Sequence, residues 1–306
     1  MGYPASGKSS VAREFEKKGY AVLNRDKAGG TVAGLLPQFQ QLLKAGKDVL
    51  LDNTFPTAES RRPFIEMHRK WADILLAPMS CLWMGTSIED AQVNACHRMV
   101  QHFGHLPTPE EIKVSKSPNI YPPVVLFKYR KELEAPTTAE GFKVEKKPFI
   151  RHHPKTHTNA AILLDFDGTL RETISGRKFP NDPKDIKILL GRKKKLKQLQ
   201  KDGVLLLGVS NQSGIAKGNP TEDQARACFD ATLKQLGIKM EYLFCPHRVP
   251  PIGCWCRKPM PGLSVHFIEK YKLAPGKCTM VGDMTSDKTF ATRSGFQYVD
   301  AKDFFA

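Results

Sequence analysis

The stretch Ile162-Leu163-Leu164-Asp165-Phe166-Asp167-Gly168-Thr169 decides the fold of the second half of the chain. Its apolar run, which begins at Ala161, predicts a buried parallel strand covered on both faces. Because residues two apart in an extended chain point to the same side, Asp165 and Asp167 both face one pocket where the strand ends. Open α/β sheets bind ligands at such carboxyl ends, and Gly168 allows the tight turn that follows.

Two carboxylates on one side of a strand end suit phosphate chemistry with a hard cation. One carboxylate attacks phosphorus and forms an aspartyl-phosphate, and the other moves the proton. Mg2+ lowers the repulsion between the anionic nucleophile and the phosphate. The alternative is a turn with two solvated aspartates, but Asp-x-Asp-Gly-Thr directly after an apolar strand favours the phosphate site.

Two later apolar runs end in polar residues that complete this site. Residues 204–209 predict a strand ending at Ser210, whose hydroxyl is suited to bind phosphate oxygens together with the amide beside it. Residues 278–281 predict a third strand, after which Asp283 completes the Mg2+ site and Asp287 supports it. Between them, a lysine in Arg-Lys-Pro supplies a cation that balances the charge on pentacoordinate phosphorus.

This ordered set resembles the signature of the haloacid dehalogenase phosphatases over residues 160–306. The resemblance implies a Rossmann-like domain with Asp165 as the nucleophile and Asp167 as the acid/base. It also implies a set of ligands: Mg2+ is held by Asp165, the Asp167 carbonyl and Asp283, and the phosphate by Ser210 and Lys258. Ser-Gly-Arg-Lys-Phe-Pro at residues 175–180 resembles the 3′-phosphatase branch in particular.

A cysteine- and histidine-rich insertion precedes the lysine. Cys245, His247, Cys254 and Cys256 give three thiolates and an imidazole, which suit a closed, structural Zn2+ site. The alternative is a set of buried cysteines without metal. The loop resembles that of small-molecule members such as histidinol-phosphate and heptose-bisphosphate phosphatases, so the substrate of this half stays open. Zinc would hold the loop that carries Lys258, two residues after Cys256.

The N-terminus fits the phosphate-binding pattern G-x-x-x-x-G-K-S, from Gly2 through Gly7 and Lys8 to Ser9. Such a loop turns backbone N–H groups toward ATP phosphates and leads into a helix whose N-terminus favours anions, with Ser9 and Ser10 as candidate cofactor ligands. Lys8 would reach the β- and γ-phosphates, and the Ser9 hydroxyl would bind Mg2+. Such a loop normally follows a buried strand, which is missing here. The alternatives are truncation, which the intact downstream motifs favour, and a degraded kinase.

Two predicted strands in the first half also end in polar residues. Residues 20–23 lead to Arg25 and Asp26, where the aspartate is placed to accept a substrate hydroxyl proton. Residues 49–51 lead to Asp52, which would hold Mg2+ through water, and Asn53. These motifs place Arg25 and Asn53 on the substrate side as well. The alternative for each is a helix cap or a turn.

These motifs, with Ser-Arg-x-x-x-Ile and Glu-Ala-Pro-Thr-Thr-Ala-Glu-Gly-Phe at 134–142, resemble the kinase domain of polynucleotide kinase 3′-phosphatase. The resemblance implies that Asp26 activates a 5′-hydroxyl and that Arg61 is a substrate-side arginine. It implies a lid helix in which Arg98 steadies the transferring phosphoryl group. Cys96 stands where that family has an arginine, so the activity of this half is in doubt.

Charge and cysteine content limit the class of protein. Lys and Arg number 47 against 31 Asp and Glu, and the formal net charge of +16 favours a polyanionic partner such as nucleic acid. Seven cysteines, an odd number, argue against a disulfide framework and for a reducing compartment. No apolar run approaches the ~20 residues of a membrane span, and no signal peptide is visible, so a nuclear or cytoplasmic location is expected.

The sequence therefore predicts an α/β protein of two three-layer domains with parallel sheets. A kinase-like domain at 1–146 lacks its first strand, a basic linker covers 147–159, and a phosphatase domain covers 160–306. In the linker, the histidines could bind metal or phosphate, but a solvated basic segment is favoured.

The function expected is healing of DNA or RNA ends, with ATP-dependent phosphorylation of a 5′-hydroxyl and Mg2+-dependent removal of a 3′-phosphate. The product would suit a DNA-repair ligase, and a scaffold partner is conceivable, although no forkhead-associated module is present. One alternative is a small-molecule phosphatase fused to a metabolite or vestigial kinase. Another is an inactive nucleic-acid-binding module.

Overall fold

The computed structural model describes residues 1–71, 78–149, 151, 153–248 and 253–306, which form two compact units. The first unit comprises residues 1–95 and 116–151, and the second comprises residues 96–115 and 152–306. The division lies within the predicted linker at 147–159. Residues 96–115, which were expected in the first domain, are grouped with the second unit instead.

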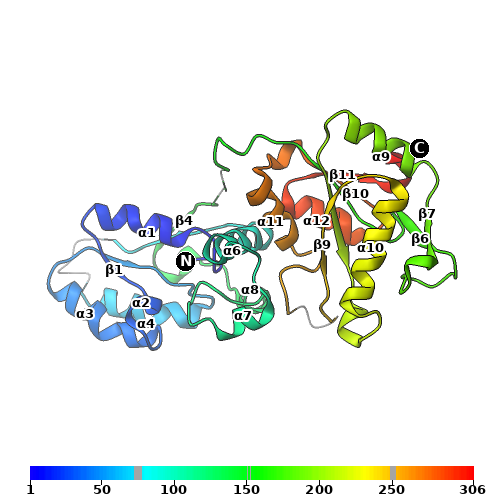
Figure 1. Cartoon of the computed structure of the whole chain (residues 1–306). Coiled ribbons are helices and arrows are strands. Elements are labelled where there is room, and N and C mark those ends of the chain that lie inside the picture. The colour runs from blue at the N-terminus through cyan, green and yellow to red at the C-terminus, as the bar shows by residue number, and fades with distance from the viewer. Residues whose placement is uncertain (72–77, 150, 152, 249–252) are drawn as a thin grey trace. The chain divides into compact units, whose positions relative to one another are not determined.

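A five-stranded parallel sheet forms the centre of the second unit, in the order β11-β10-β5-β8-β9 (Figure 1). The central strand β5 (Ile162–Leu164) pairs with β10 (Thr279–Gly282) on one side and β8 (Leu206–Asn211) on the other. The edge strands are β9 (Glu241–Cys245) and β11 (Gln297–Asp300). The strands predicted at 161–164, 204–209 and 278–281 are confirmed. The strand order reverses at β5, where open α/β sheets bind their ligands.

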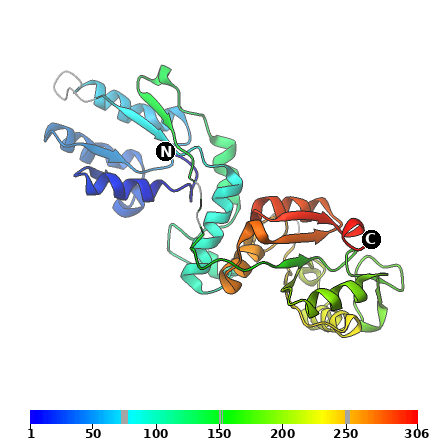
Figure 2. The ribbon, with the colours of Figure 1, turned by 90° about the horizontal axis from the view of Figure 1, so that it is seen from above.

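Helices cover both faces of this sheet, so the unit has three layers (Figure 2). One face carries α11 (Gly262–Tyr271) and α12 (Thr285–Ser294), and the other carries α9 (Arg192–Lys201) and α10 (Glu222–Leu236). The short helix α13 (Ala301–Phe304) lies on the second face. Neighbouring residues of β5 enter the two different cores, which explains why the strand is apolar throughout.

Local sequence signals fix the ends of these helices. In α10, the Thr221 hydroxyl accepts from the Gln224 N–H at 3.2 Å, and the Gln224 side chain accepts from the Thr221 N–H at 2.9 Å. This reciprocal capping satisfies donors that the first turn of a helix leaves unpaired. The helix ends at Gly237, whose φ of 67° suits a residue without a side chain.

The first unit contains two separate pairs of parallel strands (Figure 2). β1 (Ala21–Leu23) pairs with β2 (Val49–Leu51), as predicted, and β3 (Ser80–Trp83) pairs with β4 (Lys143–Lys146). Apolar side chains of α3 (Leu36–Lys44) and α4 (Ala58–Arg69) pack against the first pair around three aromatic rings: Phe39, Phe55 and Phe64.

The remaining elements are short or lie outside the sheets. In the first unit they include α1 (Lys8–Lys17), α2 (Arg25–Ala28), α3 (Leu36–Lys44), α4 (Ala58–Arg69) and α8 (Val124–Glu132). α6 (Ile88–Phe103) begins in the first unit and ends in the second, which also holds α7 (Pro109–Val114) and an antiparallel pair formed by β6 (Arg171–Thr173) and β7 (Ile186–Ile188). Within the described residues, no helix is both long and apolar enough to cross a membrane.

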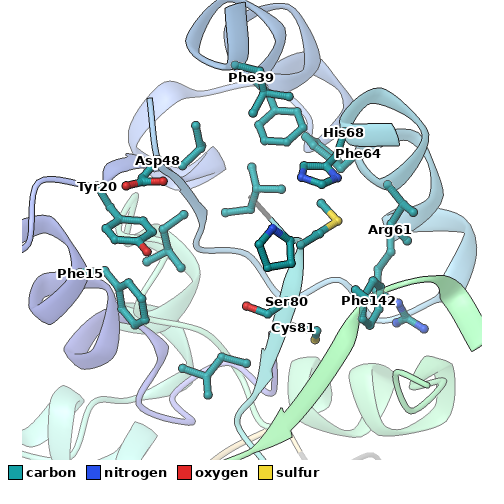
Figure 3. Close-up of a pocket in the computed structure, with 18 of the residues that line it drawn as sticks. Phe15, Tyr20, Phe39, Asp48, Arg61, Phe64, His68, Ser80, Cys81 and Phe142 are labelled. Atoms are coloured by element: carbon teal, nitrogen blue, oxygen red, sulfur yellow. The ribbon is translucent and has the colours of Figure 1, made fainter. Parts of the chain in front are cut away.

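A cavity of about 620 Å³ separates the two strand pairs of the first unit (Figure 3). Residues of β2 and β3 line it, together with rings such as Phe15, Tyr20 and Phe39. Met1 lies at its edge, where the Met1 amino group donates to the Leu82 carbonyl at 2.7 Å. Within the described residues, the cavity therefore lies between the pair formed by β1 and β2 and the pair formed by β3 and β4.

Candidate active site

Three charged side chains predicted for the site meet at the carboxyl end of β5. The Lys258 ammonium lies 2.6 Å from Asp165 Oδ1 and 2.7 Å from Asp287 Oδ1. It also donates to the Val209 carbonyl at 3.1 Å. All three charged residues are more than nine-tenths buried, so water screens these contacts weakly. The site therefore holds an ammonium between two carboxylates.

Burial and the neighbouring charges set the protonation of this group. Burial raises the pKa of Asp165 to about 7, although the attraction of Lys258 opposes it. Burial lowers the pKa of Lys258, but the attraction of Asp165 and Asp287 outweighs it, so the pKa is raised overall. Lys258 therefore keeps its proton, and its charge favours the anionic form of Asp165. A second cation bound at these oxygens would favour that form further.

The Asp167 carboxylate is held at both oxygens. The Arg171 guanidinium donates from Nε to Asp167 Oδ1 at 2.9 Å, and the Gln212 amide donates to Oδ2 at 2.8 Å. The same amide donates to the Ser210 hydroxyl at 3.0 Å. Arg171 is 1% exposed and also bonds to Thr232 at 2.8 Å. Asp167 thus has fixed hydrogen-bond donors, whereas Asp165 faces an ammonium.

A third carboxylate completes a group that suits a hard cation. Asp165, Asp283 and Asp287 each offer an oxygen within 4.8 Å of the others. The Thr169 hydroxyl donates to Asp283 Oδ1 at 3.3 Å, and burial raises the pKa of Asp283. Gly168 has φ of 84°, and a Cβ there would lie 2.4 Å from Asp283 Oδ2. Glycine is therefore required for Asp283 to approach the turn after β5.

Two residues of this site had weak or no signals in the sequence. Gln212 follows Ser210 in a polar motif, so its presence at the strand end could have been inferred. Arg171 lies beyond the Asp-x-Asp-Gly-Thr motif, and nothing in the local pattern indicates that it turns back to Asp167. Asn211, whose amide was expected to bind phosphate together with Ser210, exchanges two hydrogen bonds of 2.9 and 3.0 Å with the backbone of Lys258 and fixes that residue against β8.

The cysteine and histidine insertion forms the predicted cluster. The sulfur atoms of Cys245 and Cys254 lie 3.6 Å apart, and Cys245 Sγ lies 3.5 Å from His247 Nδ1. Cys256 Sγ lies 3.1 Å from the same nitrogen. Ligands about 2.3 Å (sulfur) and about 2.0 Å (nitrogen) from a tetrahedral Zn2+ lie roughly 3.5–3.8 Å apart. The donor set and most of its spacing therefore fit Zn2+. None of the seven cysteines forms a disulfide.

The interaction of these groups with one another changes their protonation. Hydrogen bonds to the thiols of Cys245 and Cys254 raise the pKa of His247 to about 10. Hydrogen bonds from the neighbouring thiols lower the pKa of Cys254. A thiolate is the form that binds a metal. Residues 249–252 of this insertion lie outside the described residues.

The predicted phosphate-binding loop leads directly into α1. Gly7, with φ of 92°, precedes α1, and Ser9 and Ser10 lie in the first turn of that helix. The Lys8 ammonium donates to the carbonyls of Gly2 and Tyr3 at 3.0 and 2.7 Å, so it lies across the loop. A Cβ on Gly7 would lie 2.5 Å from the Phe149 ring, which explains the glycine at that position.

The ends of β1 and β2 are tied together by side chains. The Asn24 amide donates to Asp52 Oδ2 at 3.1 Å, and the Arg25 N–H donates to Asn53 Oδ1 at 3.0 Å. Asp52 and Asn53 are buried, whereas Asp26 is exposed and pairs with the Arg25 side chain. Asn24 caps α2 by accepting from the N–H of Asp26. Arg25, Asp52 and Asn53, three of the predicted substrate-side residues, therefore lie together where β1 and β2 end.

Arg61, predicted as a substrate-side arginine, is buried among hydrogen-bond acceptors of the first unit, and its substrate role stays a prediction. Its guanidinium forms hydrogen bonds of 2.6 and 2.9 Å to both oxygens of Glu140, and it donates to the carbonyls of Phe55 and Glu134 at 3.1 Å. Arg61 is 5% exposed. Its donors are used inside the protein, so we assign it to bracing α4 against residues 134–140. Arg98 is half-buried on α6, and its role stays a prediction.

Comparison with known proteins places the aspartate site in a family. The polynucleotide kinase 3 phosphatase family model matches residues 160–306. The D-glycero-beta-D-manno-heptose-1,7-bisphosphate 7-phosphatase of Haemophilus influenzae is 34% identical over 138 residues, which cover 42% of this chain and 73% of that protein. The chain belongs to the haloacid dehalogenase-type phosphatases. The second unit is thus a phosphatase domain, and the enzyme is a phosphomonoesterase.

Two solved structures extend the comparison. The D,D-heptose 1.7-bisphosphate phosphatase from B. bronchiseptica, complexed with magnesium and phosphate, is 26% identical with a TM-score of 0.42, and the match covers 46% of this chain and 79% of that one. A chain of the Pnkp1/Rnl/Hen1 RNA repair complex is 16% identical with a TM-score of 0.32, and the match covers 98% of this chain and 94% of that one.

Proposed function

We propose that this phosphatase removes 3′-phosphates from polynucleotide ends and that its first unit phosphorylates 5′-hydroxyls with ATP. The observation that carries the proposal is the union in one chain of a phosphate-binding loop at residues 2–9 and a domain that matches the polynucleotide kinase 3 phosphatase family. The formal net charge of +16 supports a polyanionic substrate.

In the first step, an Asp165 oxygen attacks phosphorus and the bond from phosphorus to the ester oxygen breaks. Asp167 donates its proton to the leaving oxygen, so the product leaves as an alcohol and the phosphoryl group stays on Asp165. The donors on Asp167 fix its carboxyl group for this transfer. Lys258 and Ser210 lie where they can bind the phosphoryl oxygens and stabilise their charge.

In the second step, Asp167 takes a proton from water, and the water oxygen attacks phosphorus. The bond from phosphorus to Asp165 breaks, which releases inorganic phosphate and restores the carboxylate. Asp165, Asp283 and Asp287 would hold Mg2+, because three carboxylate oxygens, two of them from buried residues, suit a hard cation. Bound Mg2+ supplies positive charge that draws an anionic phosphate toward an anionic nucleophile.

The first unit supports the kinase part of the proposal through its loop and strand ends. Residues 2–9 and the start of α1 can bind the phosphates of ATP, and Ser9 can bind its Mg2+. The exposed Asp26 carboxylate is the candidate base for a 5′-hydroxyl. Asp52, Asn53 and Arg25 lie beside it as candidate substrate contacts.

A second candidate substrate is a small sugar phosphate. The Haemophilus influenzae relative is named as a heptose-bisphosphate phosphatase, and the Cys245, His247, Cys254 and Cys256 cluster resembles that of small-molecule members. A pocket of about 260 Å³ beside Asp167 is lined by basic side chains, among them Arg177 and Lys178. Those charges suit either a second phosphate of a sugar or the backbone of a polynucleotide. A purely binding module is disfavoured, because binding alone does not need Asp165.

Purified protein with Mg2+ is offered a 3′-phosphate oligonucleotide and D-glycero-β-D-manno-heptose-1,7-bisphosphate, and kcat/KM is compared. A higher value for the oligonucleotide supports the proposal, and a preference for the sugar by orders of magnitude overturns it. Asp165→Asn should abolish both activities, whereas the exposed Asp202→Asn should keep them.

Transfer of the γ-phosphate of ATP to a 5′-hydroxyl oligonucleotide tests the first unit, with Lys8→Met as the inactive variant.

A further inference from the structure

Two histidines and a glutamate form a compact group in the second unit, outside the phosphatase site. His153, His157 and Glu269 each offer a ligand atom within 4.8 Å of the others. The histidines lie in the segment expected to be a solvated linker, but the His157 side chain is only 2% exposed. The composition predicted a solvated segment, but at His157 the imidazole is buried and faces the Glu269 carboxylate.

A tight turn brings the two imidazoles to one side. The His157 N–H donates to the Pro154 carbonyl at 2.9 Å. The ring centroids of His153 and His157 lie 5.8 Å apart with an interplanar angle of 36°. The Thr156 hydroxyl lies 3.5 Å from His157 Nδ1, which leaves Nε2 facing Glu269 on α11. The backbone thus presents both rings to the same carboxylate.

The distance between His157 and Glu269 indicates a shared ligand rather than a direct bond. His157 Nε2 and Glu269 Oε1 lie 3.6 Å apart, and His157 Nε2 is buried without a hydrogen bond. Buried polar atoms usually have a partner. Two nitrogen or oxygen ligands about 2.0–2.1 Å from a tetrahedral Zn2+ lie about 3.3 Å apart. A metal ion between these atoms would give His157 Nε2 the partner that it lacks.

A third histidine orients the carboxylate. His97 Nε2 lies 2.8 Å from Glu269 Oε1, and its side chain is 12% exposed. Hydrogen bonds to a ligating carboxylate fix its direction and tune its affinity for metal. His97 is therefore placed as a positioning residue for Glu269.

We propose that His153, His157 and Glu269 bind a divalent transition metal ion, for which Zn2+ is the probe, with a fourth position open to water. Imidazole nitrogens favour Zn2+ and its neighbours over Mg2+ or Ca2+. The ion would fasten residues 153–157, where the chain enters the second unit, to α11. The alternative is a plain ion pair between His97 and Glu269 that binds no metal.

Metal content after dialysis distinguishes the two. The wild-type chain should retain one equivalent of Zn2+ in this group and one in the cysteine cluster. His157→Ala and the isosteric Glu269→Gln should each lose one equivalent, and His97→Gln should weaken the same site about 10- to 100-fold. His105→Ala, which changes an exposed histidine paired with Glu111, is the matched control and should lose none.

Cobalt substitution identifies which equivalent is lost. Co2+ bound by thiolates absorbs through sulfur-to-metal charge transfer, and Co2+ bound by histidine and carboxylate does not. His157→Ala and Glu269→Gln should keep the charge-transfer band, while Cys256→Ser should weaken it and keep the second equivalent. If His157→Ala and Glu269→Gln both retain the wild-type metal content, the proposal is wrong. Unchanged circular dichroism and phosphatase activity exclude misfolding as the cause of a loss.

Discussion

The two aspartates that follow β5 have different neighbours, although they are only two residues apart. Asp165 contacts the Lys258 ammonium, which favours a nucleophilic anion. Asp167 accepts from Arg171 and Gln212, which hold its carboxyl group in one orientation. The surroundings of each side chain therefore support the nucleophile for Asp165 and the acid/base for Asp167.

Asp167→Asn should slow hydrolysis more for a substrate with a poor leaving group than for one with a good leaving group. A sugar 3′-oxygen is a poor leaving group and needs a proton, so hydrolysis of the 3′-phosphate oligonucleotide should fall about 10²- to 10⁴-fold. p-Nitrophenyl phosphate releases a stable phenolate, so its hydrolysis should fall much less. Steady-state kcat on both substrates measures the difference, with Asp202→Asn as control. Equal losses on the two substrates would remove the acid role from Asp167.

Arg61 and Glu140 form a buried ion pair, with exposed side-chain fractions of 6% and 15%. Glu140→Gln would leave the arginine charge buried without its partner and should cost about 3–5 kcal/mol at neutral pH. Urea unfolding, followed by hydrogen exchange of α4 amides, assigns the loss to the first unit. Glu132→Gln alters an exposed pair with Lys128 and should change stability by less than about 1 kcal/mol.

The pH dependence of this pair follows from Glu140. Burial raises the pKa of Glu140, but the hydrogen bond from Arg61 and its charge lower the pKa below 4.5 overall. The folded state therefore binds the proton less readily than the unfolded state, so the stabilisation exists above pH 4.5 and is lost as the pH falls. The difference between wild type and Glu140→Gln should shrink in acid. A difference independent of pH would contradict this origin.

Among the elements, those with a local signal were predicted from sequence and those made by distant contacts were not. The apolar runs before Asp165, Ser210 and Asp283 identify the strands, because strands buried on both faces are apolar throughout. The parallel order of five strands also brings these residues to one edge. The ion pair of Arg61 was not predicted, because its partner Glu140 lies 79 residues away and is recognised only in the folded unit.

The cavity between β2 and β3 can be tested with an added strand. Within the described residues, β2 pairs only with β1 and β3 only with β4. Five apolar β-forming residues placed before Met1 should enter this gap, pair with both strands and bury apolar surface. The melting temperature of the first unit should rise by several degrees. Burying each apolar side chain stabilises the folded state by about 1.5–3 kcal/mol, and the entropy lost on ordering the strand offsets only part of this gain. A Gly-Ser extension of equal length is the control.

The Met1 amino group provides a second measurement for the same variant. Burial lowers its pKa to about 6, from 8.0. The folded state therefore holds fewer protons than the unfolded state in this range, and stability of the first unit should rise between pH 6 and 8. The apolar extension replaces the charged amine with an amide and should remove this rise. If the apolar and Gly-Ser extensions behave alike in melting, the gap does not accept a strand.

At the scale of the whole molecule, the net charge of +16 should make the binding of the two candidate substrates depend differently on salt. A polynucleotide contacts many basic side chains, and each contact releases a counterion, so its binding depends steeply on salt. A sugar bisphosphate makes few such contacts. The excess of basic residues was visible in the sequence.

The kcat/KM for a 3′-phosphate oligonucleotide should therefore fall steeply as salt rises. About five phosphate contacts, each with a slope of roughly −0.7 for single strands, predict a loss of roughly 100-fold between about 50 and 200 mM salt. p-Nitrophenyl phosphate, measured over the same range, should change little, because it contacts the aspartate site alone and reports any effect of salt on Mg2+ or on the fold. Equal salt dependence for both substrates would mean that few basic side chains contact the oligonucleotide, and the sugar phosphate would then be favoured.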